Sequence, residues 1–159
     1  MAPPARRCYA EAELTASAWT RGAFGGLMSL IDRINANPLP FAKLLGIEFI
    51  SVEEDALSAR MAIRPELCTL GDIGHGGAIM SFADTLGAAA AFVTLPPEAK
   101  GTTTVESKTN FVAAALAGAN VIGRTSLVHR GKRTSIWQTL VATEDGKLVA
   151  MTVQTQMTL

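Results

Sequence analysis

Two stretches of the chain carry apolar residues at the spacing of a helix. In the first stretch they recur every three or four positions, at Phe24, Leu27, Met28, Ile31 and Ile34. This spacing predicts a short amphipathic helix that ends between Asn35 and Pro40. The second stretch runs from Gly76 to about Thr94, with apolar positions at Ile79, Phe82, Ala83, Leu86, Ala90 and Val93. It has almost no polar face, so we expect a helix that is buried on most sides.

The rest of the pattern has the period of β-strands. Residues 47–64 are typical of a hairpin, because apolar positions from Leu57 to Ile63 alternate with polar ones after an acidic turn at Glu53 to Asp55. Four segments rich in Thr, Val and Ile follow the long helix: TTTVESKTNFVAA, ANVIGRTSLVHR, RTSIWQTLVATE and KLVAMTVQTQMTL. The turns expected at 130–132 and 145–146 are too short for crossovers, so antiparallel pairing is predicted.

This order of elements predicts an α+β fold in which a curved antiparallel sheet wraps around one long central helix, with an additional N-terminal helix. Residues 1–22 are alanine-rich and lack a sustained period, so we expect a tail or a poorly determined helix there. Residues 23–159 are expected to form a single domain, since 159 residues suffice for one core.

The amino-acid composition disfavours some classes of binding partner and indicates a cellular compartment. Lysine plus arginine equals aspartate plus glutamate at 14 each, which disfavours nucleic acid and anionic membranes. Cys8 and Cys68 are too few and too far apart for a disulfide framework, which favours a reducing, cytoplasmic compartment. The first residues lack a continuous apolar region, and Asp84 interrupts the most apolar segment. We therefore expect neither a signal peptide nor a membrane span.

The stretch GDIGHGGAIMSFADT, residues 71–85, joins a glycine-rich turn to the long helix. It lacks the spacing of a dinucleotide fingerprint and the lysine of a phosphate-binding loop. A metal site is disfavoured, because His75 and His129 are the only histidines of the chain. Gly76 and Gly77 would let a substrate oxygen approach the amides of the first helical turn, which suit a developing oxyanion. The alternative is that the glycines only permit a tight turn and close packing.

Asp84 is the only formal charge between Asp72 and Glu98, within an otherwise apolar helix. It is either a structural acid held by hydroxyls such as those of Ser81 and Thr85, or a carboxylate kept for chemistry. Eight residues of helix place it roughly 12 Å from Gly76, too far for both to act on one carbonyl.

A two-fold dimer with antiparallel helices would instead bring Asp84 of one subunit to Gly76 of the other. The small residues Gly87, Ala88 and Ala91 are expected to allow the close approach that this needs.

These residues resemble those of a known family, the hotdog-fold acyl-CoA thioesterases of the phenylacetate-degradation type. The resemblance runs from about residue 39 to 159, through PFAKLLGIEFISVE, RPELCTLGDIGHGGAIMSFADT, TTTVESKTNFVAAA and GKLVAMTVQTQ. Its most specific part is His-Gly-Gly followed by six residues and an aspartate. The resemblance implies a hotdog fold and hydrolysis of small or aromatic acyl-CoA thioesters.

The resemblance also implies roles for single residues. Asp84 matches the family's carboxylate, which acts as general base or as nucleophile; the sequence leaves both open. Gly76 matches the glycine whose amide polarises the thioester oxygen, with His75 and Gly77 beside it in the substrate-binding turn. Thr104 matches a position where a hydroxyl orients the water or the carboxylate, although an ordinary strand threonine fits it equally.

At two places the implied binding site is less defined. Thr69 stands where the family often has an asparagine or glutamine, so it keeps a hydroxyl but loses the amide donor. Arg130, Lys132 and Arg133 form a basic turn that could meet the phosphates of coenzyme A, or could be a solvated hairpin tip.

The family resemblance thus implies an acyl-CoA thioesterase whose composite site requires a homodimer, with a homotetramer as the favoured assembly. No metal and no cofactor are expected, since coenzyme A is part of the substrate. Two alternatives remain, a non-catalytic acyl-CoA-binding protein and, with less support, an enoyl-CoA hydratase or dehydratase.

Overall fold

The computed structural model describes residues 29–159. The predicted tail at 1–22 lies outside this range, as do Phe24, Leu27 and Met28 of the first predicted helix. The remainder of that helix is confirmed as α2 (Leu30–Ala36). Ser29 caps it: its hydroxyl accepts from the Asp32 amide, and the Asp32 carboxylate accepts from the Ser29 amide.

A second short helix, α3 (Pro40–Leu45), follows where the sequence predicted only the end of a helix. Proline at the first helical position starts a helix as readily as it ends one, because the missing N–H needs no partner there. The helix ends at Gly46, whose φ of 72° is left-handed. Phe41 and Leu44 of this helix are exposed.

Six antiparallel strands form one sheet in the order β1-β2-β6-β7-β8-β5. The strands are β1 (Glu48–Val52), β2 (Ala56–Ala62), β5 (Thr102–Phe111), β6 (Asn120–Arg130), β7 (Thr134–Thr143) and β8 (Leu148–Thr158). The predicted hairpin and the four later strands are therefore confirmed. The β6–β7 and β7–β8 pairs are hairpins, joined at the expected turns.

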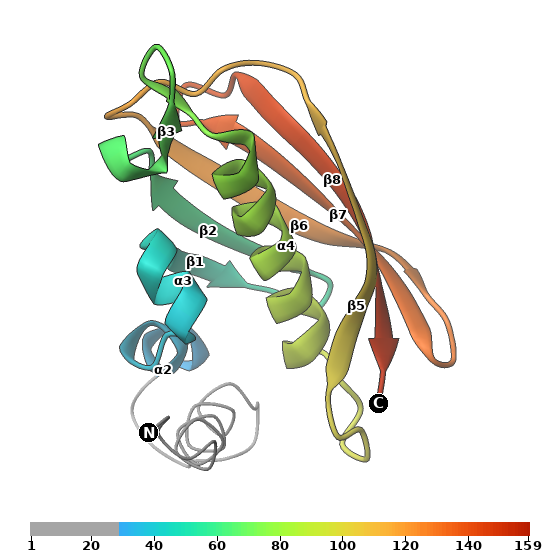
Figure 1. Ribbon diagram of the computed structural model, residues 1–159. Helices are drawn as coiled ribbons and strands as arrows, with labels where there is room; N and C mark the ends of the chain where they lie inside the picture. The colour runs from blue at the N-terminus through green and yellow to red at the C-terminus, as the bar shows by residue number, and fades with distance from the viewer. Residues whose placement is uncertain (1–28) are drawn as a thin grey trace, which may run out of the picture.

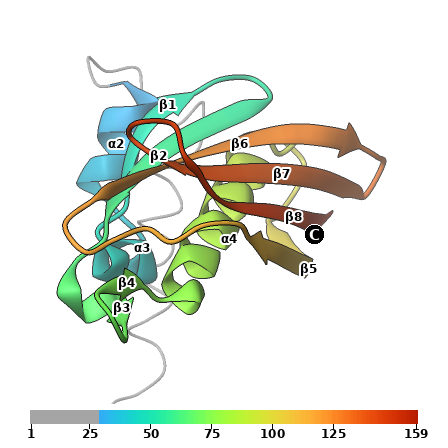
Figure 2. The same cartoon turned by 90° about the horizontal axis from the view of Figure 1, so that it is seen from above.

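The long helix α4 (Gly76–Val93) packs on β2, β5, β6, β7 and β8, so the sheet curves around it (Figures 1 and 2). The fully buried side chains of Phe82, Leu86, Trp137 and Val141 lie between the helix and the sheet. Burial of apolar surface at this contact is the main stabilising contribution to the fold. The predicted α+β hotdog fold is confirmed.

One expectation about α4 was wrong. The helix is not buried on most sides, because a stripe along it is exposed or half-buried, at Met80, Ser81, Asp84, Thr85 and Ala88. The α3 helix packs beside α4, and its Phe41 lines a pocket with part of this stripe. Within residues 29–159, α4 is the one helix long and apolar enough to cross a membrane. Its packing against the sheet identifies it as the core helix.

A short hairpin precedes α4 and was not predicted. A 3₁₀ turn at Pro65–Leu67 leads into β3 (Cys68–Thr69), which pairs with β4 (Ile73–Gly74) beside the N-terminal end of α4 (Figure 1). Gly71 and Asp72 at its tip have positive φ values of 76° and 53°. The Leu67 carbonyl accepts from the His75 amide, which fixes the start of α4 to this hairpin.

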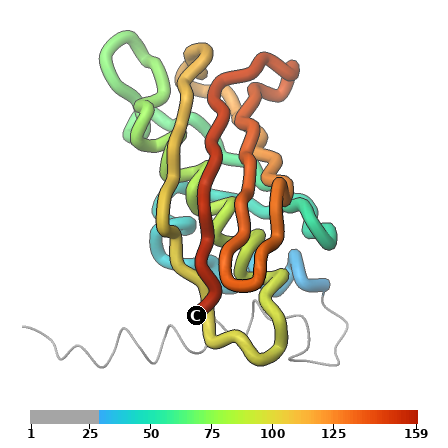
Figure 3. The backbone as a smooth tube through the Cα atoms, turned by 90° about the vertical axis from the view of Figure 1, so that its right-hand side faces the viewer, coloured from blue at the N-terminus to red at the C-terminus, as the bar shows by residue number. Residues whose placement is uncertain are grey.

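The two edges of the sheet differ. The outer edge of β1 is covered by α2, where Asn35 donates to the Phe49 carbonyl and accepts from the Phe49 amide, both at 2.9 Å. The opposite edge is β5, beside β8 (Figure 3), and Val105 on it is 60% exposed. Exposed edge strands pair readily with another strand.

Candidate active site

The first turn of α4 offers one free amide. His75 is the N-cap residue, and its Nδ1 accepts from the Gly77 amide at 2.9 Å. The next two amides, of Ala78 and Ile79, both donate to the His75 carbonyl. In the part of the chain that the structure describes, the Gly76 amide has no acceptor. A helix N-terminus with a free N–H attracts an anionic or carbonyl oxygen.

This arrangement separates the roles of the two glycines. The Gly77 amide is already used by His75, so of the two predicted glycines only Gly76 can donate to a substrate. A Cβ at Gly76 would lie 3.2 Å from Cζ of Phe111. Phe111, at the end of β5, therefore covers Gly76 and forms a wall beside the free amide. Sequence reasoning missed Phe111, because nothing in the strand pattern ties it to the start of the helix.

Asp84 lies on the half-buried stripe of α4, two turns beyond Gly76. It lines a surface pocket of about 250 Å³ together with Phe41, Met80, Ser81, Thr85 and Ser107. Within residues 29–159 no group hydrogen-bonds or ion-pairs with its carboxylate. The Thr85 hydroxyl donates to the Ser81 carbonyl at 2.7 Å instead. The structural acid held by neighbouring hydroxyls is therefore not what the fold shows.

A side chain of the sheet holds the backbone of Asp84. Gln154 of β8 is fully buried, and its Nε2 donates to the Asp84 carbonyl oxygen at 3.3 Å. Gly87 makes this contact possible, because a Cβ there would lie 2.2 Å from Gln154 Oε1. Gly87 is thus buried against the sheet, and the expectation that it serves a helix–helix contact was wrong. Ala91 is buried too, which leaves Ala88 on the stripe.

Thr104 is hydrogen-bonded to the sheet and is not among the residues that line the Asp84 pocket. Its hydroxyl accepts from Gln156 Nε2 at 2.7 Å. Ser107, three residues further along β5, lines that pocket instead. Sequence reasoning missed Ser107, because a β-bulge between Thr104 and Glu106 shifts which residues of the strand face the helix.

Comparison with known proteins identifies the family of this chain. Residues 71–150, half of the chain, match the model of the thioesterase superfamily, and this range contains both Gly76 and Asp84. The chain belongs to the thioesterase superfamily. It is 29% identical over 114 residues to Rv1847, an esterase candidate of Mycobacterium tuberculosis, across 70% of this chain and 81% of that protein. The solved structure of Rv1847 matches with a TM-score of 0.72 and 27% identity, over 76% of this chain and 97% of the other.

Two further solved structures match this thioesterase-superfamily chain. A mutant of the phenylacetic acid degradation protein PaaI from Thermus thermophilus has 26% identity and a TM-score of 0.70, over 76% of this chain and 100% of the other. A Streptococcus mutans protein with bound acetyl-CoA shares the fold, with 18% identity and a TM-score of 0.66 over 71% and 88%. The predicted resemblance to PaaI-type hotdog thioesterases is confirmed at the level of the family.

Two further residues from the sequence analysis of this superfamily member, Thr69 and Asp72, lie on the hairpin before α4. Thr69 is exposed on the β3–β4 hairpin that leads into α4. Asp72, on the same hairpin, is also exposed, and its carbonyl accepts from the Ala117 amide. Thr69 therefore lies on the element that holds Gly76 in place. Within residues 29–159 there is no group of three or more His, Cys, Asp or Glu side chains that could hold a metal ion.

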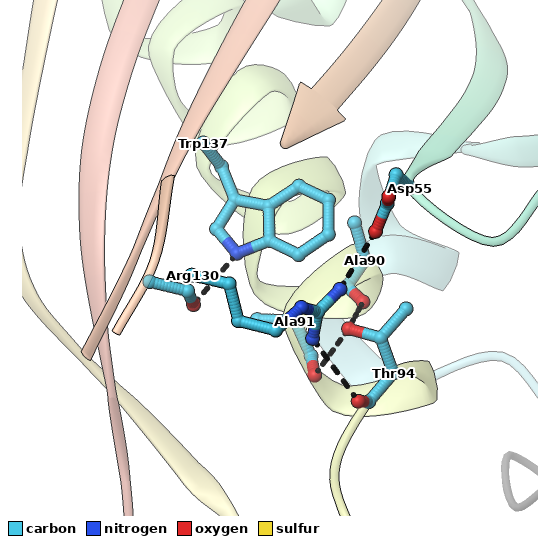
Figure 4. Close-up of polar contacts among 7 residues, drawn as sticks. Asp55, Ala90, Ala91, Thr94, Arg130 and Trp137 are labelled. Atoms are coloured by element: carbon cyan, nitrogen blue, oxygen red, sulfur yellow. Dashed lines mark hydrogen bonds and ion pairs between the residues drawn. The ribbon is translucent and has the colours of Figure 1, made fainter. Parts of the chain in front are cut away.

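The basic turn lies at the other end of α4 (Figure 4). Arg130 donates to the Thr94 carbonyl at 3.4 Å and forms an ion pair with Asp55 at 2.7 Å. Its guanidinium is thus engaged by the helix C-terminus, where a cation is favoured. Lys132 lines a pocket of about 300 Å³ there, and Arg133 is exposed. Of the three predicted phosphate contacts, Lys132 and Arg133 are the more available.

Arg124 has a structural role. It forms a two-bond ion pair with Glu53, at 2.9 Å and 3.1 Å, which joins β6 to the β1–β2 turn. The hydrogen bond and the charge of Arg124 lower the pKa of Glu53. Both side chains are more than half exposed, so the contribution of this pair to stability is small.

Proposed function

We propose that this protein hydrolyses small or aromatic acyl-CoA thioesters to a free acid and coenzyme A, in a site that two subunits share. One observation carries the proposal. The Gly76 amide and the Asp84 carboxylate both lack a partner in the described chain, and both face apolar side chains, Phe111 for the first and Phe41 and Met80 for the second. Hydrolysis of a thioester is accelerated by a donor that stabilises the oxyanion and by a base, such as a carboxylate, that accepts the proton of the attacking water.

In the proposed reaction the Gly76 amide donates to the thioester oxygen, and the dipole of α4 stabilises the negative charge that develops there. The oxygen of a water molecule forms a bond to the carbonyl carbon while its proton passes to Asp84. The carbon–sulfur bond then breaks, and the thiolate of coenzyme A takes that proton. Phe41 and Met80 would hold the acyl group, which suits an apolar acyl chain.

The two groups reach one substrate through a dimer. Asp84 lies roughly 12 Å along the helix from Gly76, so we propose that the partner's Asp84 serves this chain's Gly76. Antiparallel helices that satisfy this cross at Met80, which is 42% exposed on the stripe of α4. The uncovered edge of β5 supports the same assembly, because two such edges can pair.

Coenzyme A would extend from this site toward the partner's basic turn. In the antiparallel arrangement the C-terminal end of the partner's α4 lies on the substrate side, and Lys132 and Arg133 would bind phosphate as exposed cations. We further propose association of two dimers into a tetramer, and a cytoplasmic location in line with the free thiol of Cys68.

The test is release of free thiol from a panel of acyl-CoA thioesters. Asp84→Asn should lower kcat by about 10²–10⁴-fold, because the proton acceptor is lost. Gly76→Pro removes the amide hydrogen and adds a ring whose Cβ would lie 3.2 Å from Cζ of Phe111, so Gly76→Ala is the control for that contact. Proline is compatible with the first helical position and with the extended backbone of His75, at φ −62° and ψ 134°. Gly76→Pro should lower kcat by about 10²–10³-fold.

Glu98→Gln, in the exposed loop after α4, is the matched control and should keep wild-type turnover. Calorimetric binding of acyl-CoA without any thiol release by the wild type would indicate a non-catalytic binding protein instead. Hydration of an enoyl-CoA that depends on His75 would indicate a hydratase.

A further inference from the structure

Each of the two groups that carry the proposed reaction has an exposed phenylalanine beside it. Phe111, at the end of β5, is 55% exposed, and Phe41, on α3, is 53% exposed. Phe111 lies against Gly76, the first residue of α4. Phe41 lines a pocket with Asp84, eight residues further along that helix. Large apolar side chains that stay exposed beside a polar site often contact a ligand or a second chain.

The ring of Phe111 points with its tip at Gly76. A Cβ on Gly76 would lie 3.2 Å from Cζ, 3.4 Å from Cε1 and 3.6 Å from Cε2 of Phe111, which are the outermost atoms of the ring. The Gly76 amide is one bond from that Cα, and within residues 29–159 it has no acceptor. A thioester oxygen that accepts from this amide therefore lies close to the ring, and the first carbons of the acyl group are within reach of it.

Phe41 has a comparable relation to Asp84. Both residues line the pocket of about 250 Å³, together with Met80. The α3 helix places Phe41 there because it packs beside α4. Leu44, one turn later on α3, is 65% exposed but does not line this pocket. Phe41 is thus the aromatic residue of the Asp84 half of the site.

The shared site brings the two kinds of half together. In the proposed dimer the partner's Asp84 acts on a thioester held by Gly76. The partner's Phe41 lines the same pocket as that carboxylate, so it comes to the thioester with it. Within one chain Phe111 and Phe41 cannot serve one substrate in this way, because roughly 12 Å of helix separates the two groups beside which they lie.

We propose that Phe111 and the partner's Phe41 bind the acyl group between them and make the protein selective for flat, aromatic acyl groups. Aromatic rings attract one another in offset-stacked and edge-to-face arrangements, which saturated acyl groups cannot form. An acetyl group has one carbon beyond the carbonyl and is too short to contact both rings. The inference rests on the proposed function and deepens it, because it names the residues that select the acyl group and places them on different subunits.

The first experiment compares thiol release from phenylacetyl-CoA and from acetyl-CoA. Phe111→Ala and Phe41→Ala should each lower kcat/KM about tenfold for phenylacetyl-CoA but only about twofold for acetyl-CoA. Phe111→Leu keeps an apolar side chain against Gly76, so it should lose the same preference with an unchanged melting temperature. Leu44→Ala and Val128→Ala are the controls. Both residues are more than 60% exposed and outside the Asp84 pocket, so these variants should keep the wild-type preference.

The second experiment tests whether the two phenylalanines come from different subunits. When Asp84→Asn and Gly76→Pro chains are refolded together, the intact site of a mixed dimer takes Gly76 from the Asp84→Asn chain and Asp84 from the Gly76→Pro chain. Phe111→Ala should therefore lower the recovered phenylacetyl-CoA activity about tenfold only when it is on the Asp84→Asn chain. Phe41→Ala should do so only when it is on the Gly76→Pro chain.

The possible failures of the inference and of the proposed function differ. An equal loss whichever chain carries the change, or a wild-type preference in both Phe111→Ala and Phe41→Ala, would overturn the inference while the proposed hydrolysis stands. Absence of thiol release from the wild type would overturn the proposed function and, with it, the inference.

Discussion

Two buried glutamines of β8 each lie opposite a hydroxyl residue of β5, yet only one of the two pairs is complete in its hydrogen bonds. We call the pair of Gln156 and Thr104 the Gln156 level, and the pair of Gln154 and Ser107 the Gln154 level. At the first, Gln156 has two threonine hydroxyls of β5 as partners. At the second, α4 comes so close at Gly87 that Gln154 Nε2 bonds to the helix backbone, and the Ser107 hydroxyl of β5 is buried without a hydrogen-bond partner in the described residues. The comparison teaches that similar polar residues in one core layer can be fully hydrogen-bonded in one place and left incomplete where the helix comes closer to the sheet.

Of the changes at these two levels, the larger effect on turnover is expected from a side chain added between helix and sheet at Gly87. Gly87→Ala would place a Cβ 2.2 Å from Gln154 Oε1, and the glutamine is fully buried. Either Gln154 leaves its place or α4 moves, and both displace Asp84. We expect a loss of about 1–3 kcal/mol in the free energy of unfolding and about a hundredfold in kcat.

Gly101→Ala is the control for this change, because a Cβ at Gly101 meets no atom within 4 Å and should alter neither quantity. In the double variant Gly87→Ala/Gln154→Ala the clash is relieved. Stability should recover there while kcat stays low, as urea unfolding and turnover would show. Wild-type kcat in Gly87→Ala would show that the Gln154 level does not position Asp84.

At the complete level we expect a similar loss of stability with little effect on turnover. Thr104→Val leaves Gln156 Nε2 without its acceptor in a buried site, which should cost about 1–3 kcal/mol in the free energy of unfolding. Because Thr104 does not line the Asp84 pocket, kcat should change by less than about twofold. A large loss of kcat at unchanged stability would restore the catalytic role that the family resemblance implied for Thr104.

Much of the fold could be predicted from the sequence, because the spacing of apolar residues alone distinguishes helices from strands. The hairpin, the four later strands and α4 follow from it. The α3 helix was missed, since Pro40 is compatible with both the end and the start of a helix. The burial of α4 was overestimated, because an apolar stripe looks the same in sequence whether the sheet or another surface covers it.

The site was predictable where it depends on one local element. The start of a helix at His-Gly-Gly and the separation of Gly76 from Asp84 by the rise of that helix both follow from the sequence. That His75 Nδ1 accepts from the Gly77 amide and leaves Gly76 free was not predicted. The place of Ser107 in the pocket was not predictable. The bulge at Val105 shifts which residues of β5 face the helix, and no residue type in the sequence signals a bulge there. Phe111 meets Gly76 only through the tertiary fold.

The most direct test of a site shared between subunits is complementation between two inactive variants. Asp84→Asn and Gly76→Pro are unfolded together, refolded as a mixture, and assayed for thiol release against each variant refolded alone. If Asp84 serves the partner's Gly76, each mixed dimer has one site with both lesions and one intact site, so the mixture recovers about a quarter of wild-type activity. If both groups acted within one chain, every site would carry a lesion. A mixture as inactive as its parents, with mixed dimers shown by native mass spectrometry, would contradict the shared site.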